Sequence, residues 1–158
     1  MFNMYLIGQG NDTHELTEMR NAVIKLGSYS IKTNWRIISH SDGDIVLHSI
    51  ANAILGSLQL GDIGLYFKDT DYRCKNMDSV KIINFVLTRL RKAKYKLVNI
   101  DLTITCENIL LGVNKILIQK SLVKILKTKF INVKATRFEH PSNLIKCDAV
   151  VLIKSIKN

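Results

Sequence analysis

The stretch that organises the chain is His40–Asp71, with the sequence HSDGDIVLHSIANAILGSLQLGDIGLYFKDTD. It opens with Ser41-Asp42-Gly43-Asp44, whose side-chain oxygens suit the start of a helix. Apolar residues then recur at helical spacing, which predicts one amphipathic helix that ends before Gly61. Because two of the four His and five of the Asp residues fall here, we expect a functional site around this helix.

The segments around this helix predict an α/β protein of the α+β type, built as a sandwich of two layers. Strands are expected at 4–7, 22–27, 29–38, 96–105, 130–138 and 147–156, and further helices at 79–92 and 112–127. Residues 8–14 are expected to form a turn or strand end, and 15–21 show no clear pattern. This order predicts a mixed sheet with helices on one face, in a single domain over residues 1–158.

Composition and charge narrow the function classes. The net charge of +10 suits a polyanionic partner, but the Lys residues are scattered and no basic face carries interleaved aromatic residues, so no nucleic-acid partner is expected. Cys74, Cys106 and Cys147 lie far apart and are expected to be free thiols. No apolar run reaches about 18 residues and no targeting segment is visible, which favours an intracellular protein without a membrane partner.

Three side chains suit a catalytic metal site. Asp12 and His14 point to the same face of an extended segment, about 7 Å apart by strand rise. His48 shares a polar stripe of the predicted helix with Asp44 and Asn52. One carboxylate and two imidazoles with an open fourth position favour zinc, with manganese or cobalt as alternatives. In the alternative without a metal, Asp12 is a turn residue and His48 is buried and hydrogen-bonded to Asp44.

Two further groups of residues suit phosphate chemistry. The five Asp of the central stretch are either caps and turn residues or a cluster that holds divalent ions, which in turn bind phosphates. Thr136, Arg137 and Glu139 lie where a predicted strand runs into a loop. A hydroxyl and a guanidinium group contact phosphates, and a carboxylate is a potential ligand of a second metal ion.

Together these pieces resemble the 2-C-methyl-D-erythritol 2,4-cyclodiphosphate synthases, enzymes of non-mevalonate isoprenoid biosynthesis. The matching pieces occur in family order and at family spacing across essentially the whole chain. They are Ile7–His14, His40–His48, Leu55-Gly56, Leu60–Gly64, Phe67–Asp71 and Asn132–Thr136 with Glu139.

The resemblance implies a homotrimer whose sheets face the trimer axis and whose active sites lie between adjacent subunits. It implies that the 2-phosphate of 4-diphosphocytidyl-2-C-methyl-D-erythritol 2-phosphate attacks the β-phosphorus of the same molecule, so that CMP leaves and a cyclic diphosphate forms. Such a reaction requires positioning and charge neutralisation rather than a covalent side-chain intermediate. The implied compartment is a bacterial cytoplasm or the stroma of a plastid-type organelle.

The resemblance also implies two kinds of bound ion. Asp12, His14 and His48 would bind one zinc-type ion that polarises the β-phosphate. Glu139 would help to hold a second ion, magnesium or manganese, on the diphosphate.

Two residues are expected to be catalytic, His40 from the resemblance and Arg137 as a departure from it. His40 would stabilise the transition state and, with Ser41, hold the 2-phosphate, and Arg137 would replace lost phosphate contacts by its charge. The residues implied to bind the substrate are Asp12, Thr13, His14, His40, Ser41, Asp62, Ile63, Gly64, Phe67, Lys68, Asp69, Thr70, Asp71, Thr136 and Arg137.

The chain departs from the family pattern mainly on the nucleotide side. Ile109-Leu110 stands where the family has Pro-Lys, Arg137 replaces a second Thr, and the loop over residues 141–145 is shorter. Lys68 and Asn52 replace a Pro and an Asp. We expect a weakened but working enzyme; the alternative is a trimeric metal-binding homologue with reduced or lost catalysis.

Overall fold

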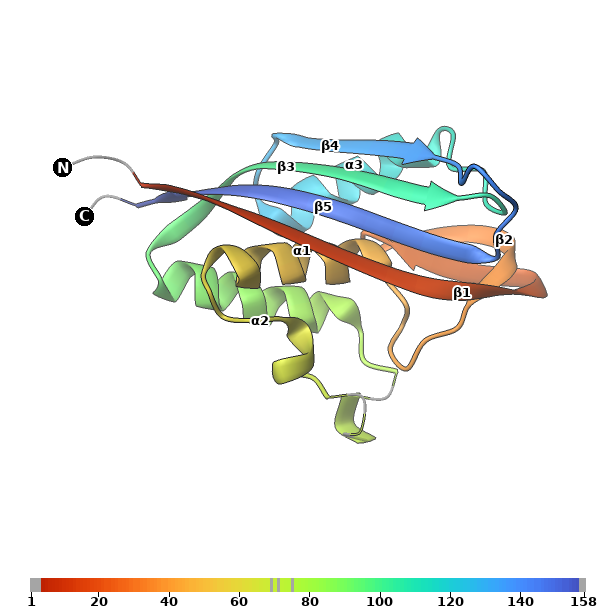
Figure 1. The fold of residues 1–158 in the computed structure, drawn as a ribbon, viewed down its shortest axis with the longest axis horizontal. Coiled ribbons are helices and arrows are strands. Elements are labelled where there is room, and N and C mark those ends of the chain that lie inside the picture. The colour runs from red at the N-terminus through yellow and green to blue at the C-terminus, as the bar shows by residue number, and fades with distance from the viewer. Residues whose placement is uncertain (1–3, 69, 71, 75, 157–158) are drawn as a thin grey trace.

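The computed structural model describes residues 4–68, 70, 72–74 and 76–156. Within these residues a five-stranded sheet is covered on one face by three α-helices (Figure 1). The strands are β1 (Tyr5–Leu26), β2 (Tyr29–Ile37), β3 (Tyr95–Cys106), β4 (Ile131–Thr136) and β5 (Leu144–Ser155). The α-helices are α1 (Ile45–Ser57), α2 (Ser79–Lys92) and α3 (Asn114–Leu126), and short 3-10 turns lie at Ile63–Leu65 and Tyr72–Cys74.

The sheet is mixed, as the sequence predicted. Its strand order is β2-β1-β5-β3-β4, and neighbouring strands are antiparallel except for the parallel pair β3 and β4. Side chains alternate along each strand, so that Ile100, Leu102 and Ile104 of β3 are buried on the helix-covered face. The other face carries half-buried and exposed residues, which makes the domain a two-layer α+β sandwich.

The prediction for the start of the chain was wrong, because β1 runs without a break through the expected turn at 8–14. Gly8 and Gly10 allow the close approach of α1 instead of forming a turn. A Cβ on Gly8 would lie 1.9 Å from the carbonyl oxygen of Ala53, and one on Gly10 would lie 2.2 Å from that of Ser49. The patternless segment 15–21 also belongs to β1, where the pairing with β2 shifts register between residues 18 and 22.

The hairpin of β1 and β2 is tied to the start of α1 by one buried carboxylate. Gly27 and Ser28 make the turn with φ values of 60° and 63°, which confirms the turn predicted near Gly27. Asp44 accepts hydrogen bonds from the backbone N–H groups of Gly27 at 2.8 Å, Ser28 at 2.6 Å and Leu47 at 3.1 Å. Burial raises the pKa of Asp44, although these hydrogen bonds oppose the shift.

The remaining elements agree closely with the prediction. Helix α2 has the expected bounds, β3, α3 and β4 differ by one or two residues at each end, and β5 begins at Leu144 rather than at residue 147. Cys74, Cys106 and Cys147 are free thiols, as expected. Among the described residues, no helix is both long and apolar enough to cross a membrane.

Candidate metal centre and substrate pocket

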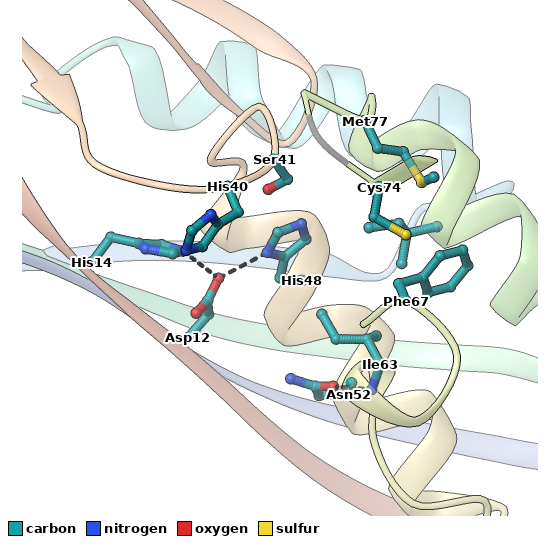
Figure 2. Close-up of a pocket in the computed structure, with 12 residues that line it drawn as sticks. Asp12, His14, His40, Ser41, His48, Asn52, Ile63, Phe67, Cys74 and Met77 are labelled. Carbon is teal, nitrogen blue, oxygen red and sulfur yellow. Dashed lines mark hydrogen bonds and ion pairs between the residues drawn. The ribbon is translucent and has the colours of Figure 1, made fainter. Parts of the chain in front are cut away.

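Asp12, His14 and His48 form a cluster in which one ligand atom of each residue lies within 4.8 Å of the others. Oδ2 of Asp12 lies 2.9 Å from Nδ1 of His48 and 3.2 Å from Nε2 of His14. Figure 2 shows both rings directed at this carboxylate, one from β1 and one from α1. The structure thus brings the three predicted ligands together, and the alternative in which His48 bonds to Asp44 is wrong.

The closeness of the cluster follows from how α1 packs on β1. Asp12 and His14 alternate with exposed residues on β1, so both side chains lie on the helix-covered face. Asp12 pairs with Cys147 of β5, and this register fixes the position of Asp12 along the strand direction of the sheet. Because Gly8 and Gly10 carry no side chain, the backbone of α1 approaches β1 closely enough for His48 to reach the carboxylate.

The electrostatics of the cluster favour a cation. Burial alone raises the pKa of the Asp12 carboxyl group, but hydrogen bonds and charges from His14 and His48 outweigh burial. The pKa of Asp12 is therefore held well below its ordinary value, and the group is ionised at neutral pH. An ionised carboxylate beside two imidazoles is a donor set that zinc accepts, so these residues fit the ion that the sequence implied.

The cluster lies in a pocket of about 250 Å³. In Figure 2, polar side chains gather on one side of this pocket and Phe67, Cys74 and Met77 on the other. The predicted site residues that line it are Asp12, His14, His40, Ser41, His48, Ile63, Gly64 and Phe67.

The loop that carries His40 and Ser41 is fixed by the segment before α2. The N–H of Asn76 donates to the carbonyl of His40 at 2.9 Å, and the N–H of Asp42 donates to the carbonyl of Met77 at 3.2 Å. These bonds hold the loop at the pocket, so that His40 and Ser41, the predicted contacts of the 2-phosphate, line it.

Four lining residues were missed as site residues: Asn52, Cys74, Met77 and Ile82. The Oδ1 atom of Asn52 accepts from the N–H of Ile63 at 3.0 Å and so positions the turn at Ile63–Leu65. The spacing of four residues from His48 to Asn52 was the signal that could have found it. Met77 and Ile82 carry no pattern that separates them from core residues.

Thr136 and Arg137 line a separate pocket of about 200 Å³, together with residues 106, 109–112, 115 and 135. Thr136 ends β4, and Arg137 and Glu139 are exposed in the segment that follows. Over the described residues, this pocket shares no lining residue with the metal pocket. A single chain therefore does not bring Thr136 and Arg137 to the cluster.

The other predicted contacts lie outside both linings. The side chain of Thr13 is exposed on the helix-free face, although its backbone N–H donates to Oδ1 of Asp12 at 2.9 Å. Asp62, Lys68 and Thr70 are exposed near the 3-10 turns. Asp69 and Asp71 lie outside the described residues.

Comparison with known proteins identifies a family to which this chain is similar. The model of the YgbB family matches residues 5–154. A 2-C-methyl-D-erythritol 2,4-cyclodiphosphate synthase of Mycoplasmoides gallisepticum is 41% identical over 151 residues, which are 96% of this chain and 97% of that protein.

Solved structures agree with the sequence relatives. A 2C-methyl-D-erythritol-2,4-cyclodiphosphate synthase in a form bound to CDP has a TM-score of 0.85 and 30% identity, over 93% of this chain and 99% of that one. The bifunctional IspDF from Campylobacter jejuni has a TM-score of 0.91 and 30% identity, over 99% of this chain and 44% of that one. The fold and the motifs therefore point to the same relatives.

Proposed function

The chain belongs to the YgbB family, and we propose that Asp12, His14 and His48 form the metal centre of its reaction. The protein is a cyclodiphosphate synthase of isoprenoid biosynthesis. It converts 4-diphosphocytidyl-2-C-methyl-D-erythritol 2-phosphate to 2-C-methyl-D-erythritol 2,4-cyclodiphosphate and CMP. The observation that carries this conclusion is a family match over residues 5–154 that includes an intact ligand cluster. The relatives give no support to the alternative of a homologue without catalysis.

The donor set supports a zinc-type ion at the cluster, with manganese or cobalt as alternatives. Bound there, a divalent ion would supply positive charge that polarises a phosphate oxygen. Asp12 would contribute a carboxylate oxygen, and the two imidazoles would contribute one ring nitrogen each, from β1 and from α1. Glu139 would help to hold a second ion, magnesium or manganese, on the diphosphate.

The pocket beside the cluster suits the methylerythritol phosphate half of the substrate. His40 and Ser41 lie at its polar side, where they would hold the 2-phosphate, and His40 would stabilise the developing charge. Ile63 and Phe67 line its apolar side and would contact the carbon chain. A volume of about 250 Å³ is at the lower limit for a ligand site, so the nucleotide half requires another surface.

A homotrimer would supply that surface. The pocket of Thr136 and Arg137 would face the metal pocket of the neighbouring subunit and would take the cytidine diphosphate part, with Arg137 on phosphate. The helix-free face of the sheet exposes Ile7 by 71% and Val150 by 45%, which supports its burial around a trimer axis. The compartment, a bacterial cytoplasm or plastid-type stroma, and the lack of a nucleic-acid partner stay predictions.

The activity is tested by CMP release from the substrate in the presence of Mg²⁺ or Mn²⁺. The wild type is expected to release CMP, and His48→Ala is expected to lose this activity. Thr88→Ala, on the outer side of α2, is the control and is expected to retain it. Wild-type protein that releases no CMP above a chelator-treated sample would contradict the proposed function.

A further inference from the structure

The side of the His48 ring that faces away from Asp12 contacts α2. Nε2 of His48 lies 2.8 Å from Oγ of Ser79, while Nδ1 faces Asp12. Ser79 is the first residue of α2 and has no exposed surface, and His48 is 7% exposed. The ring is therefore held between two polar partners from different elements.

Asp42 holds Ser79 in place through both of its carboxylate oxygens. Oδ1 of Asp42 accepts a hydrogen bond from the Ser79 hydroxyl, and Oδ2 accepts from the Ser79 backbone N–H at 3.2 Å. The Lys25 ammonium lies 3.5 Å from Oδ2 of Asp42, and the N–H of Asp44 donates to Oδ1 at 3.4 Å. Asp42 is the acceptor in each of these contacts, because a carboxylate accepts hydrogen bonds and does not donate one.

The hydrogen bonds of Ser79 indicate which nitrogen of the His48 ring carries a hydrogen. A serine hydroxyl has one proton, and Ser79 donates it to Asp42. Oγ of Ser79 can then only accept from His48, so Nε2 of His48 carries a hydrogen. When a bound ion takes the place of the contact between Nδ1 and Asp12, Nδ1 of the neutral ring would direct a lone pair at that ion, which is the form that ligates a metal.

We propose that Ser79, held by Asp42, is a positioning residue that sets the orientation and the tautomer of His48 for metal binding. The proposal rests on the proposed function, because it assumes an ion at Asp12, His14 and His48. Partners of this kind behind a metal-ligating His typically contribute roughly 10–100-fold to metal affinity.

The test is the zinc affinity of the full chain, measured by competition with a chromogenic chelator. Ser79→Ala is expected to bind zinc roughly 10–100-fold more weakly than the wild type. Ser79→Thr keeps the hydroxyl and is expected to recover most of the affinity. Ser57→Ala is the matched control, because it removes a buried hydroxyl of α1 that bonds only to the carbonyl of Ile54 in the described structure. Its zinc affinity is expected to equal that of the wild type.

A second measurement separates positioning from a general loss of structure. In the zinc-loaded wild type, the Nε2–H proton of His48 is expected to exchange slowly enough to give an NMR signal, and Ser79→Ala is expected to lose it. Thermal unfolding without zinc shows whether each variant is folded. If Ser79→Ala does not fold, Asp42→Asn replaces it in the test and is expected to bind zinc more weakly than the wild type.

The outcomes distinguish this proposal from the one it rests on. If Ser79→Ala binds zinc as tightly as the wild type while His48→Ala does not, the positioning role is wrong and the metal centre stands. If His48→Ala and the wild type bind zinc equally, the metal centre is wrong and the role of Ser79 falls with it.

Discussion

The metal cluster depends on two residues that carry no functional group. Gly8 and Gly10 leave space for the backbone of α1 directly against β1, and this contact brings His48 within 2.9 Å of Asp12. An added methyl group at either position would overlap backbone atoms, which cannot move as the end of a side chain can. The glycines are therefore part of the site through packing.

Gly8→Ala is expected to destabilise the protein by about 3 kcal/mol or more, because its Cβ would overlap the carbonyl of Ala53. Gly112→Ala is the control, since its Cβ would meet nothing within 4 Å. Its expected effect ranges from none to about 1 kcal/mol of stabilisation. Urea unfolding of both variants measures the difference, and equal stabilities would contradict the packing role of Gly8.

Asp12 gives the metal-free protein a stability that depends on pH. Burial opposes ionisation of Asp12, but His14 and His48 together lower its pKa below the ordinary value of 3.8. A lowered pKa in the folded state stabilises the protein above the unfolded pKa, and this contribution is lost as the pH falls through and below 3.8. Asp12→Asn should therefore be less stable than the wild type at neutral pH.

The measurement is urea unfolding of both chelator-treated proteins as the pH is lowered to that region. The difference between wild type and Asp12→Asn is expected to shrink with the pH. A difference that stays constant would show that the charge of Asp12 is not its source.

The sequence predicted the three clustered side chains but not the whole pocket. Asp12 and His14 were recognisable because alternate residues of any extended segment share a face, even though the segment was expected to be a turn. Met77 and Ile82 are apolar residues, and only the three-dimensional contacts show that they border a pocket.

At the scale of elements, Asp44 joins the β1–β2 hairpin to α1. Its three backbone partners come from the turn at Gly27 and Ser28 and from the first turn of α1. Because α1 carries His48, the same carboxylate also fixes the metal ligand relative to the sheet.

Asp44→Ala is expected to cost about 3 kcal/mol or more, because it leaves three N–H groups, two of them buried and one half-buried, without their acceptor. Asp78→Ala removes the equivalent cap of α2. The Asp78 side chain is 47% exposed, accepts from the N–H of Val80 at 2.9 Å and lies 3.6 Å from the Lys25 ammonium. That loss should cost about 1 kcal/mol. Chemical denaturation of the two variants tests the order, and a larger loss for Asp78→Ala would contradict the role of Asp44.

Helices and the alternating strand β3 were predictable because their apolar periods are clear along the chain. The long strand β1 was not, because glycine serves both turns and close packing and the sequence alone does not separate the two. Helix α1 was expected to be amphipathic, but nearly all of its residues are buried between the sheet and α2.

At the scale of the whole molecule, many of the predicted site residues line one of two separate pockets of the chain. The proposed trimer joins the metal pocket of one subunit to the Thr136 and Arg137 pocket of the next. The sequence could suggest this arrangement only through its resemblance to a family, because no pattern in one chain encodes which surfaces of two copies meet.

Mixing two inactive variants tests the arrangement. His48→Ala removes one half of each site and Arg137→Ala the other, so each homotrimer should be inactive or strongly weakened. Trimers reassembled from an equal mixture should regain CMP release at about a quarter of their sites, where both intact halves meet across one interface. If both variants are weak and the mixture recovers nothing, each site lies within one subunit.

The central claim, that Asp12, His14 and His48 hold the ion that serves the reaction, is tested most directly by anomalous scattering. Crystals grown with zinc would be measured on both sides of the zinc absorption edge. The account predicts one strong anomalous peak per chain between Oδ2 of Asp12, Nε2 of His14 and Nδ1 of His48, and no such peak in His48→Ala. A peak elsewhere, or none at the cluster, would contradict it.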